Sequence, residues 1–118
     1  MLYDPKWEKP STVTPESPRE VLLSAARLIE IHGLAKETQR DAEGRLCLMG
    51  AISVARMGAT CKYDSVTCRA TLAVHKYLLS VGVSEDITAP SGSAQWNNQP
   101  QRTQTEVVAA LRGAAQMC

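Results

Sequence analysis

Four cysteines and two histidines are the residues best suited to chemistry, because such side chains can bind zinc or form a nucleophile and its base. They are Cys47, Cys61, Cys68, Cys118, His32 and His75. Cys68 and His75 share a helical face but lie seven residues apart, which is about 10.5 Å along a helix axis. Zinc ligands must lie within about 2.3 Å of one ion, so this pair needs a third element to complete a site. We therefore expect no metal, no cofactor and no catalytic residue.

The cysteines also lack the pattern of a disulfide-rich protein. No Cys-x-x-Cys pair is present, and residues 1–10 lack the apolar stretch of a signal peptide. No apolar run approaches the roughly 20 residues that span a bilayer. We expect a cytoplasmic protein with no membrane partner, whose cysteines are mostly buried small hydrophobes, with Cys118 as an exposed thiol.

Length and composition predict a single all-α domain. The chain has 118 residues, of which 44% are apolar and fifteen are alanine, and it contains no phenylalanine. Alanine favours helices, whereas no clean alternation of apolar and polar residues marks a strand. The 13 basic and 12 acidic residues give a net charge of +1, which argues against an overall attraction to nucleic acid.

Helix signals predict a compact bundle of about four helices within residues 17–118. Ser17 and Thr103 each precede a glutamate by three residues, which is the spacing of a capping box. The other two expected helices cover residues 46–57, which are apolar almost all round, and residues 64–79. The first and last helices therefore have well-defined starts.

The helix expected over residues 64–79 carries two apolar stripes on roughly opposite sides. One stripe is Val66, Ala70, Ala73, Tyr77 and Val81, and the other is Cys68, Leu72, His75 and Leu79. Arg69 and Lys76 lie in a gap between the stripes. This pattern predicts a helix that packs against neighbours on both sides.

Three segments are expected to lie outside these helices. Residues 1–16 form a proline-rich extended arm, with Tyr3 and Trp7 as candidate anchors for a partner. Residues 36–46 contain a turn signal and fit either a small hairpin or an irregular loop. Residues 83–102 form a polar linker of a length that is usually functional or flexible.

The linker carries Trp96 among polar residues. In the favoured interpretation Trp96 folds back as a plug over the core, which is the usual fate of a large aromatic side chain. In the other interpretation it belongs to a recognition loop, in which Asn97, Asn98 and Arg102 supply directional hydrogen bonds. The sequence leaves both interpretations open.

Residues 46–57 and the helix that follows could imitate a helix-turn-helix. Their connection is longer than the usual three or four residues, and the helix that would enter DNA begins with the anion Asp64. A small DNA-binding transcriptional regulator is therefore an alternative function, and nucleic acid is not the expected partner.

Three motifs resemble a family of small bacterial, mostly actinobacterial, and bacteriophage proteins known as a domain of unknown function. They are the opening helix Val21–Gly33, the segment Cys47-Leu-Met-Gly-Ala-Ile52 and the segment Trp96–Val107. The second is similar to the family's Cys-x-x-Gly-Ala core motif. The third is similar to its Trp-Asn-Asp-x-x-x-Arg-Thr-x-x-Glu-Val tail motif.

The resemblance covers residues 21 to 115 and has two departures. Asn98 stands where the family usually has aspartate, and Leu34 stands where it often has an aromatic residue. The resemblance implies a helical fold and a phage or mobile-element setting, and it implies no activity.

These observations lead us to expect a non-enzymatic protein-interaction module, such as a phage or mobile-element accessory protein that binds or inhibits a host protein. A small-molecule or nucleotide-binding protein is a further alternative to the DNA-binding regulator. The expected partner is another protein, and the sequence leaves homodimer formation open.

Overall fold

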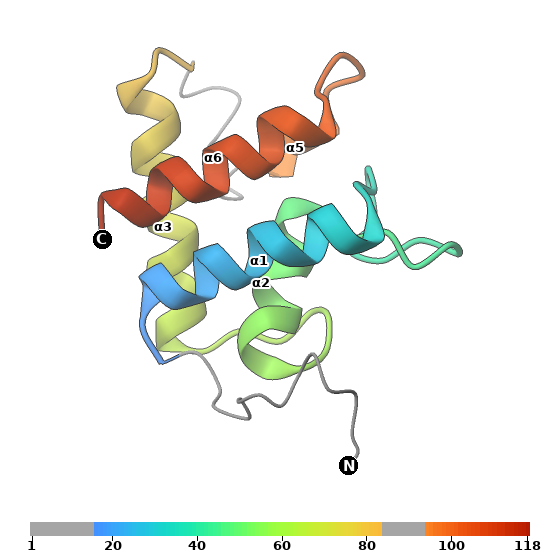
Figure 1. Ribbon diagram of the computed structural model, residues 1–118, viewed down its shortest axis with the longest axis horizontal. Helices are drawn as coiled ribbons and strands as arrows, with labels where there is room; N and C mark the ends of the chain where they lie inside the picture. The colour runs from blue at the N-terminus through green and yellow to red at the C-terminus, as the bar shows by residue number, and fades with distance from the viewer. Residues whose placement is uncertain (1–15, 84–93) are drawn as a thin grey trace.

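A computed structural model describes residues 16–83 and 94–118, and within them the chain forms five helices and no strand. The helices are α1 (Pro18–His32), α2 (Leu48–Met57), α3 (Ser65–Ser80), α5 (Ala94–Asn98) and α6 (Gln104–Gln116). α1 and α6 lie side by side and run in opposite directions, and α3 crosses behind both (Figure 1). The prediction of an all-α bundle is confirmed. The expected arm, apart from Glu16, lies outside the described residues.

Local sequence sets where α1 and α6 begin. The Ser17 side chain accepts a hydrogen bond from the backbone N–H of Glu20, and the Glu20 carboxylate accepts one from the backbone N–H of Ser17. Thr103 and Glu106 make the same reciprocal pair at the start of α6. Each pair satisfies two backbone donors that the first helical turn leaves unpaired, so both expected capping boxes are confirmed.

α2 begins at Leu48, two residues later than the sequence suggested, because Cys47 acts as its cap. The Cys47 sulfur accepts a hydrogen bond from the backbone N–H of Gly50 at 3.3 Å. An oxygen-bearing side chain usually fills this position. The thiol is therefore a structural group, and the helix behind it is buried along most of its first two turns.

The hydrophobic core lies between α1, α2 and α6, and α3 closes its remaining side. Its larger members are Val21, Leu22, Leu28, Ile29, Leu46, Leu48, Ile52, Val74, Leu78, Trp96, Val107 and Leu111. Buried alanines fill the space where α1 meets α6 and allow close approach of the two backbones. His32 is exposed at the last position of α1.

The expectation that α3 packs on both sides is wrong for the described residues. One side of α3 is buried, through Val66, Thr67, Ala70, Val74 and Leu78. On the other side Leu72 is 48% exposed and Leu79 is 37% exposed. The periodicity correctly located an apolar stripe, but no described element covers it.

The expectation for the cysteines is also corrected. Cys47 is buried, whereas Cys61, Cys68 and Cys118 are exposed. Cys61 lies in a loop and Cys68 lies on the solvent side of α3. The prediction of an exposed Cys118 is confirmed.

The structure decides the two remaining expectations about loops, one for residues 36–46 and one for residues 83–102. Residues 36–46 contain only isolated backbone bridges, in which Leu46 pairs with both Leu34 and Arg40, so the irregular loop is the better description. The expected linker over residues 83–102 contains the short helix α5. This helix brings Trp96 against the core.

Two caps make the protein sensitive to acid. A hydrogen bond from the backbone N–H of Thr67 and the nearby Arg56 hold the pKa of Asp64 below its ordinary value of 3.8. A hydrogen bond from the backbone N–H of Thr103 likewise lowers the pKa of Glu106 from 4.5. Because these carboxyls bind protons more weakly in the folded state, their stabilisation is complete above the unfolded pKa values and is lost as pH falls through the folded ones.

We therefore expect the melting temperature to fall as the pH is lowered from about 5 to about 3. Thermal melts followed by circular dichroism across this range measure the effect. The variant D64N/E106Q should start less stable and lose less on acidification. An unchanged pH slope in that variant would contradict this account.

Candidate functional site

The residues near Trp96 that the sequence predicted as a site come together where α5 meets the start of α2 and the loop after α1. We call this contact the Trp96 joint and define it by Trp96, Asn97, Asn98 and Arg102. Trp96 is 5% exposed and belongs to the core, as the plug interpretation predicts. Asn97 is 1% exposed, and its Oδ1 accepts a hydrogen bond from the backbone N–H of Leu48 at 3.0 Å. Its Nδ2 donates to the carbonyl of Ala35 at 3.1 Å. One amide therefore ties α5 to the start of α2 and to the loop after α1.

Arg102 covers the exposed edge of this joint. Its guanidinium carbon lies 4.2 Å from the centre of the Trp96 ring, which is within cation–π range. Its Nε donates to the carbonyl of Trp96 at 3.1 Å, and its other nitrogens contact Gln99 and Glu106. The Arg102 side chain is only 13% exposed. The Arg102 guanidinium thus makes its hydrogen bonds to other residues of this chain, namely Trp96, Gln99 and Glu106.

Lys36 and Asn98 complete the joint from the loop side. Lys36 Nζ donates to the carbonyls of Gln99 and Arg102, the latter at 2.7 Å. Asn98 Oδ1 accepts a hydrogen bond from the backbone N–H of Glu37 at 2.7 Å. The structure therefore gathers Trp96, Asn97, Asn98 and Arg102, but it uses their polar groups to hold the fold together. Tyr3 and Trp7 lie outside the described residues.

The role of Asn98 leads to a prediction about its replacement by the aspartate of the resembled motif. Both contacts of its side chain use Oδ1 as an acceptor, from Glu37 and from Asn97 Nδ2. A carboxylate accepts the same two bonds, so N98D should change the free energy of unfolding by less than about 0.5 kcal/mol at neutral pH. N98A should cost about 1 kcal/mol because it removes the acceptor. Urea denaturation of both variants checks this, and a large loss in N98D would contradict it.

No group of three or more metal-binding side chains occurs in the described ranges. Burial raises the pKa of the Cys47 thiol, which keeps it protonated and poorly nucleophilic. In the same part of the chain, no helix is both long enough and apolar enough to cross a membrane.

A shallow groove of about 540 Å³ lies where α6 meets α1 and α3. It is lined by Glu30, Tyr77, Gln104, Thr105, Val108, Ala109, Arg112, Gly113 and Gln116. Its two charged residues neutralise each other, since Arg112 Nη2 lies 2.7 Å from Glu30 Oε1. The groove therefore presents no unpaired charge to a ligand.

The apolar stripe of α3 that the sequence predicted to pack against a neighbour lies on the solvent side of the helix. We call it the α3 outer face and define it by Cys68, Leu72, His75 and Leu79. At 100° per residue these four side chains fall within about 60° of one another. They point well away from the buried side that contacts α1, α2 and α6.

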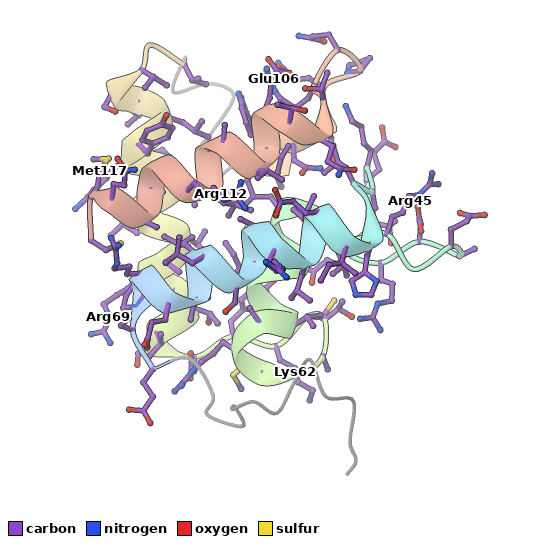
Figure 2. All side chains as sticks on the ribbon, in the orientation of Figure 1. Arg45, Lys62, Arg69, Glu106, Arg112 and Met117 are labelled. Carbon is purple, nitrogen blue, oxygen red and sulfur yellow. The ribbon has the colours of Figure 1, made fainter. Side chains whose placement is uncertain are left out.

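Positive charge borders the α3 outer face. Arg69 and Lys76 follow one edge of the apolar stripe, and both are exposed. Figure 2 shows Arg69 projecting from the margin of α3. Neither residue forms an ion pair with a described side chain, and α3 itself contains no acidic residue. The face is therefore an apolar stripe with a cationic edge.

Comparison with known proteins gives one match. The model of a family described as a family of unknown function, DUF6197, matches residues 13–117. No curated protein and no solved structure matches the chain.

Proposed function

Because the chain belongs to DUF6197, a family of unknown function, its role has to be inferred from its own surfaces, and we propose that it is a non-enzymatic protein-interaction module. The proposed binding site is the α3 outer face. The buried Trp96 joint is not part of that site, because its side chains already contact one another.

The observation that carries this proposal is the exposure of Leu72 and Leu79 on one face of a helix. Contiguous apolar surface with a polar border is typical of protein-binding sites. Full burial of an exposed leucine gains roughly 1.5–3 kcal/mol, and Leu72 and Leu79 are 48% and 37% exposed. Covering what remains exposed therefore gains about 0.5–1.5 kcal/mol for each leucine, which contributes to a specific affinity.

The cationic edge indicates the chemistry of the partner. An amphipathic helix with acidic residues beside its apolar stripe would pair with Arg69 and Lys76 while covering Leu72 and Leu79. A second copy fits less well in an antiparallel arrangement, because the cationic edge of one copy would meet that of the other. We therefore propose an acidic, apolar helical segment of another protein as the partner.

A defined probe tests this proposal. A synthetic amphipathic helix with leucines on one face and flanking glutamates should bind saturably in a fluorescence titration. A matched peptide with lysines in place of the glutamates should bind at least about tenfold more weakly. Raising the salt concentration should weaken the acidic peptide selectively.

Substitutions locate the binding to the face. L72E should weaken the acidic peptide at least about tenfold. I31E is the matched control, because Ile31 is 49% exposed at the far end of α1 and Leu72 is 48% exposed (Figure 1). Equal loss in both variants, or equal binding of the two peptides, would overturn the proposal.

The wider role that we propose is that of a small cytoplasmic accessory protein of a phage or mobile element that binds or inhibits a host protein. The resemblance of the motifs supports this setting. Proteins captured from a host lysate by wild type and I31E, but not by L72E, are the candidates to test for an acidic helix. The absence of any such protein would count against this role.

A further inference from the structure

His75 lies on the α3 outer face at the edge opposite the cationic one. At 100° per residue its side chain is about 60° from that of Leu72. Lys76 and Arg69 are about 40° and about 60° from Leu72 in the other direction. The imidazole is half-buried, so part of it is accessible on the face. The two leucines therefore have two positive side chains on one side and a titratable ring on the other.

No carboxylate on α3 is available to the His75 imidazole. Within residues 16–83 and 94–118, His75 forms no hydrogen bond and no ion pair. The other titratable side chains of α3 are Cys68, Arg69, Lys76 and Tyr77, and the helix contains no acidic residue. A partner could therefore supply the carboxylate that α3 lacks.

The helices packed against α3 do not supply a carboxylate either. They are α1, α2 and α6, and they contact the buried side of α3. α2 contains no acidic residue, Glu20 and Glu106 are held in their capping boxes, and Glu30 pairs with Arg112. The positive or titratable basic side chains of these three helices are Arg19, Arg27, His32, Arg56 and Arg112. A proton on His75 thus adds a third positive charge to the α3 outer face, with no carboxylate of these helices to balance it.

The two edges of the face suit the two edges of an acidic amphipathic helix. If that helix has glutamates on both sides of its leucines, one row of carboxylates meets Arg69 and Lys76 and the other row meets His75. Histidine is the side chain that ordinarily changes its charge between about pH 5 and 8, whereas glutamate stays mostly ionised above about pH 5. A carboxylate beside an imidazole favours its protonated form. The complex therefore binds a proton more tightly than the free chain, and affinity rises as the pH falls until the free chain is protonated too.

We infer that His75 is a specificity-determining residue of the α3 outer face and that it makes the binding of the acidic helix depend on pH. Its imidazolium pairs with the row of partner carboxylates that lies away from Arg69 and Lys76. This inference rests on the proposed function, because it concerns the same face and the same partner. Since an ion pair at a partly exposed site contributes modestly, we expect the affinity to rise about threefold between about pH 7.5 and about pH 5.5.

Titration of the acidic peptide at these two pH values tests the inference. Both values lie above the range in which Asp64 and Glu106 lose their stabilisation, so the fold stays intact. Wild type should bind about threefold more tightly at the lower pH. H75Q keeps a polar side chain without a titratable ring, and it should bind equally at both. H32Q is the matched control, because His32 is the other histidine of the chain and is exposed at the end of α1, and it should respond as wild type does.

A second peptide separates titration of the protein from titration of the peptide. It carries cysteic acid in place of each glutamate, because a sulfonate stays charged across this range. Wild type should show the same change of about threefold with it. A pH response that is absent with this peptide, or that persists in H75Q, would contradict the inference. Weaker binding of wild type at the lower pH would also contradict it, because the partner would then bury a neutral imidazole.

The outcomes distinguish this inference from the proposed function. If the peptide binds wild type equally at both pH values and L72E weakens that binding, the function stands and the role of His75 is wrong. If the peptide binds wild type at neither pH, the proposed function is wrong and the inference falls with it. A gain of about threefold in wild type and H32Q, but not in H75Q, is the result that the inference predicts.

Discussion

Replacing Trp96 by alanine is expected to lower the free energy of unfolding by about 3–5 kcal/mol, which is the usual cost of removing a buried tryptophan. The indole is 5% exposed and belongs to the core. Its loss also removes the ring beneath the Arg102 guanidinium, which lies 4.2 Å from the ring centre. Because the total stability of a folded protein is typically about 5–15 kcal/mol, W96A should unfold at a much lower urea concentration.

Urea denaturation followed by circular dichroism measures this loss. R102A is a useful comparison, because it removes the guanidinium above the indole ring but leaves Trp96 itself in place. It should lower the free energy of unfolding by about 1–2 kcal/mol. A stability loss below about 1 kcal/mol in W96A would contradict the plug interpretation and return Trp96 to the list of recognition residues.

The second large effect is expected at Gly50, where a side chain has no space. A Cβ at this position would lie 2.3 Å from the backbone carbonyl oxygen of Gln39. That oxygen accepts a hydrogen bond from the backbone N–H of Cys47, so it is fixed beside the start of α2. Backbone cannot rotate out of the way as a side chain can, and we expect G50A to lose more than about 3 kcal/mol.

Gly113 provides a matched control within the same protein. A Cβ there would lie equally close, at 2.3 Å, to the Tyr77 ring, which is a half-buried side chain that can shift toward solvent. Alanine also improves helix propensity by about 1 kcal/mol over glycine. G113A should therefore cost about 1 kcal/mol or less in thermal or urea unfolding. If G50A and G113A lowered the free energy of unfolding equally, the claim that a clash with backbone is more destabilising than a clash with a movable side chain would be wrong.

The features that could be predicted from the sequence are those with local causes. The Ser17 and Thr103 capping boxes need only residues three positions apart, and both are present. The all-α class follows from alanine content and from the absence of strand alternation. The apolar stripe through Leu72 could be read from periodicity, but periodicity does not say whether a neighbour covers it.

The features that could not be predicted depend on long-range contacts. Asn97 binds groups 49 and 62 residues away in sequence, so nothing beside it in the chain shows that it is a structural residue. α5 is five residues long in a polar segment, and its helix is held by Trp96 in the core rather than by propensity. The cap by Cys47 was missed because sulfur seldom fills that role.

In the proposed interaction, the residues that stabilise the fold and the residues that bind the partner are separate sets. Trp96, Asn97 and Arg102 hold the loops against the core, while none of the described residues covers the α3 outer face. Surface substitutions on that face should leave stability nearly unchanged, so their effects on binding can be measured without unfolding the protein.

A charge-reversal titration tests the proposed binding face most directly. The wild-type chain and R69E/K76E are each titrated with the acidic and the basic amphipathic peptide under the same salt conditions. We expect wild type to prefer the acidic peptide by about tenfold and R69E/K76E to prefer the basic one by a similar factor. If both proteins prefer the same peptide, or neither discriminates between them, the α3 outer face is not the site we propose.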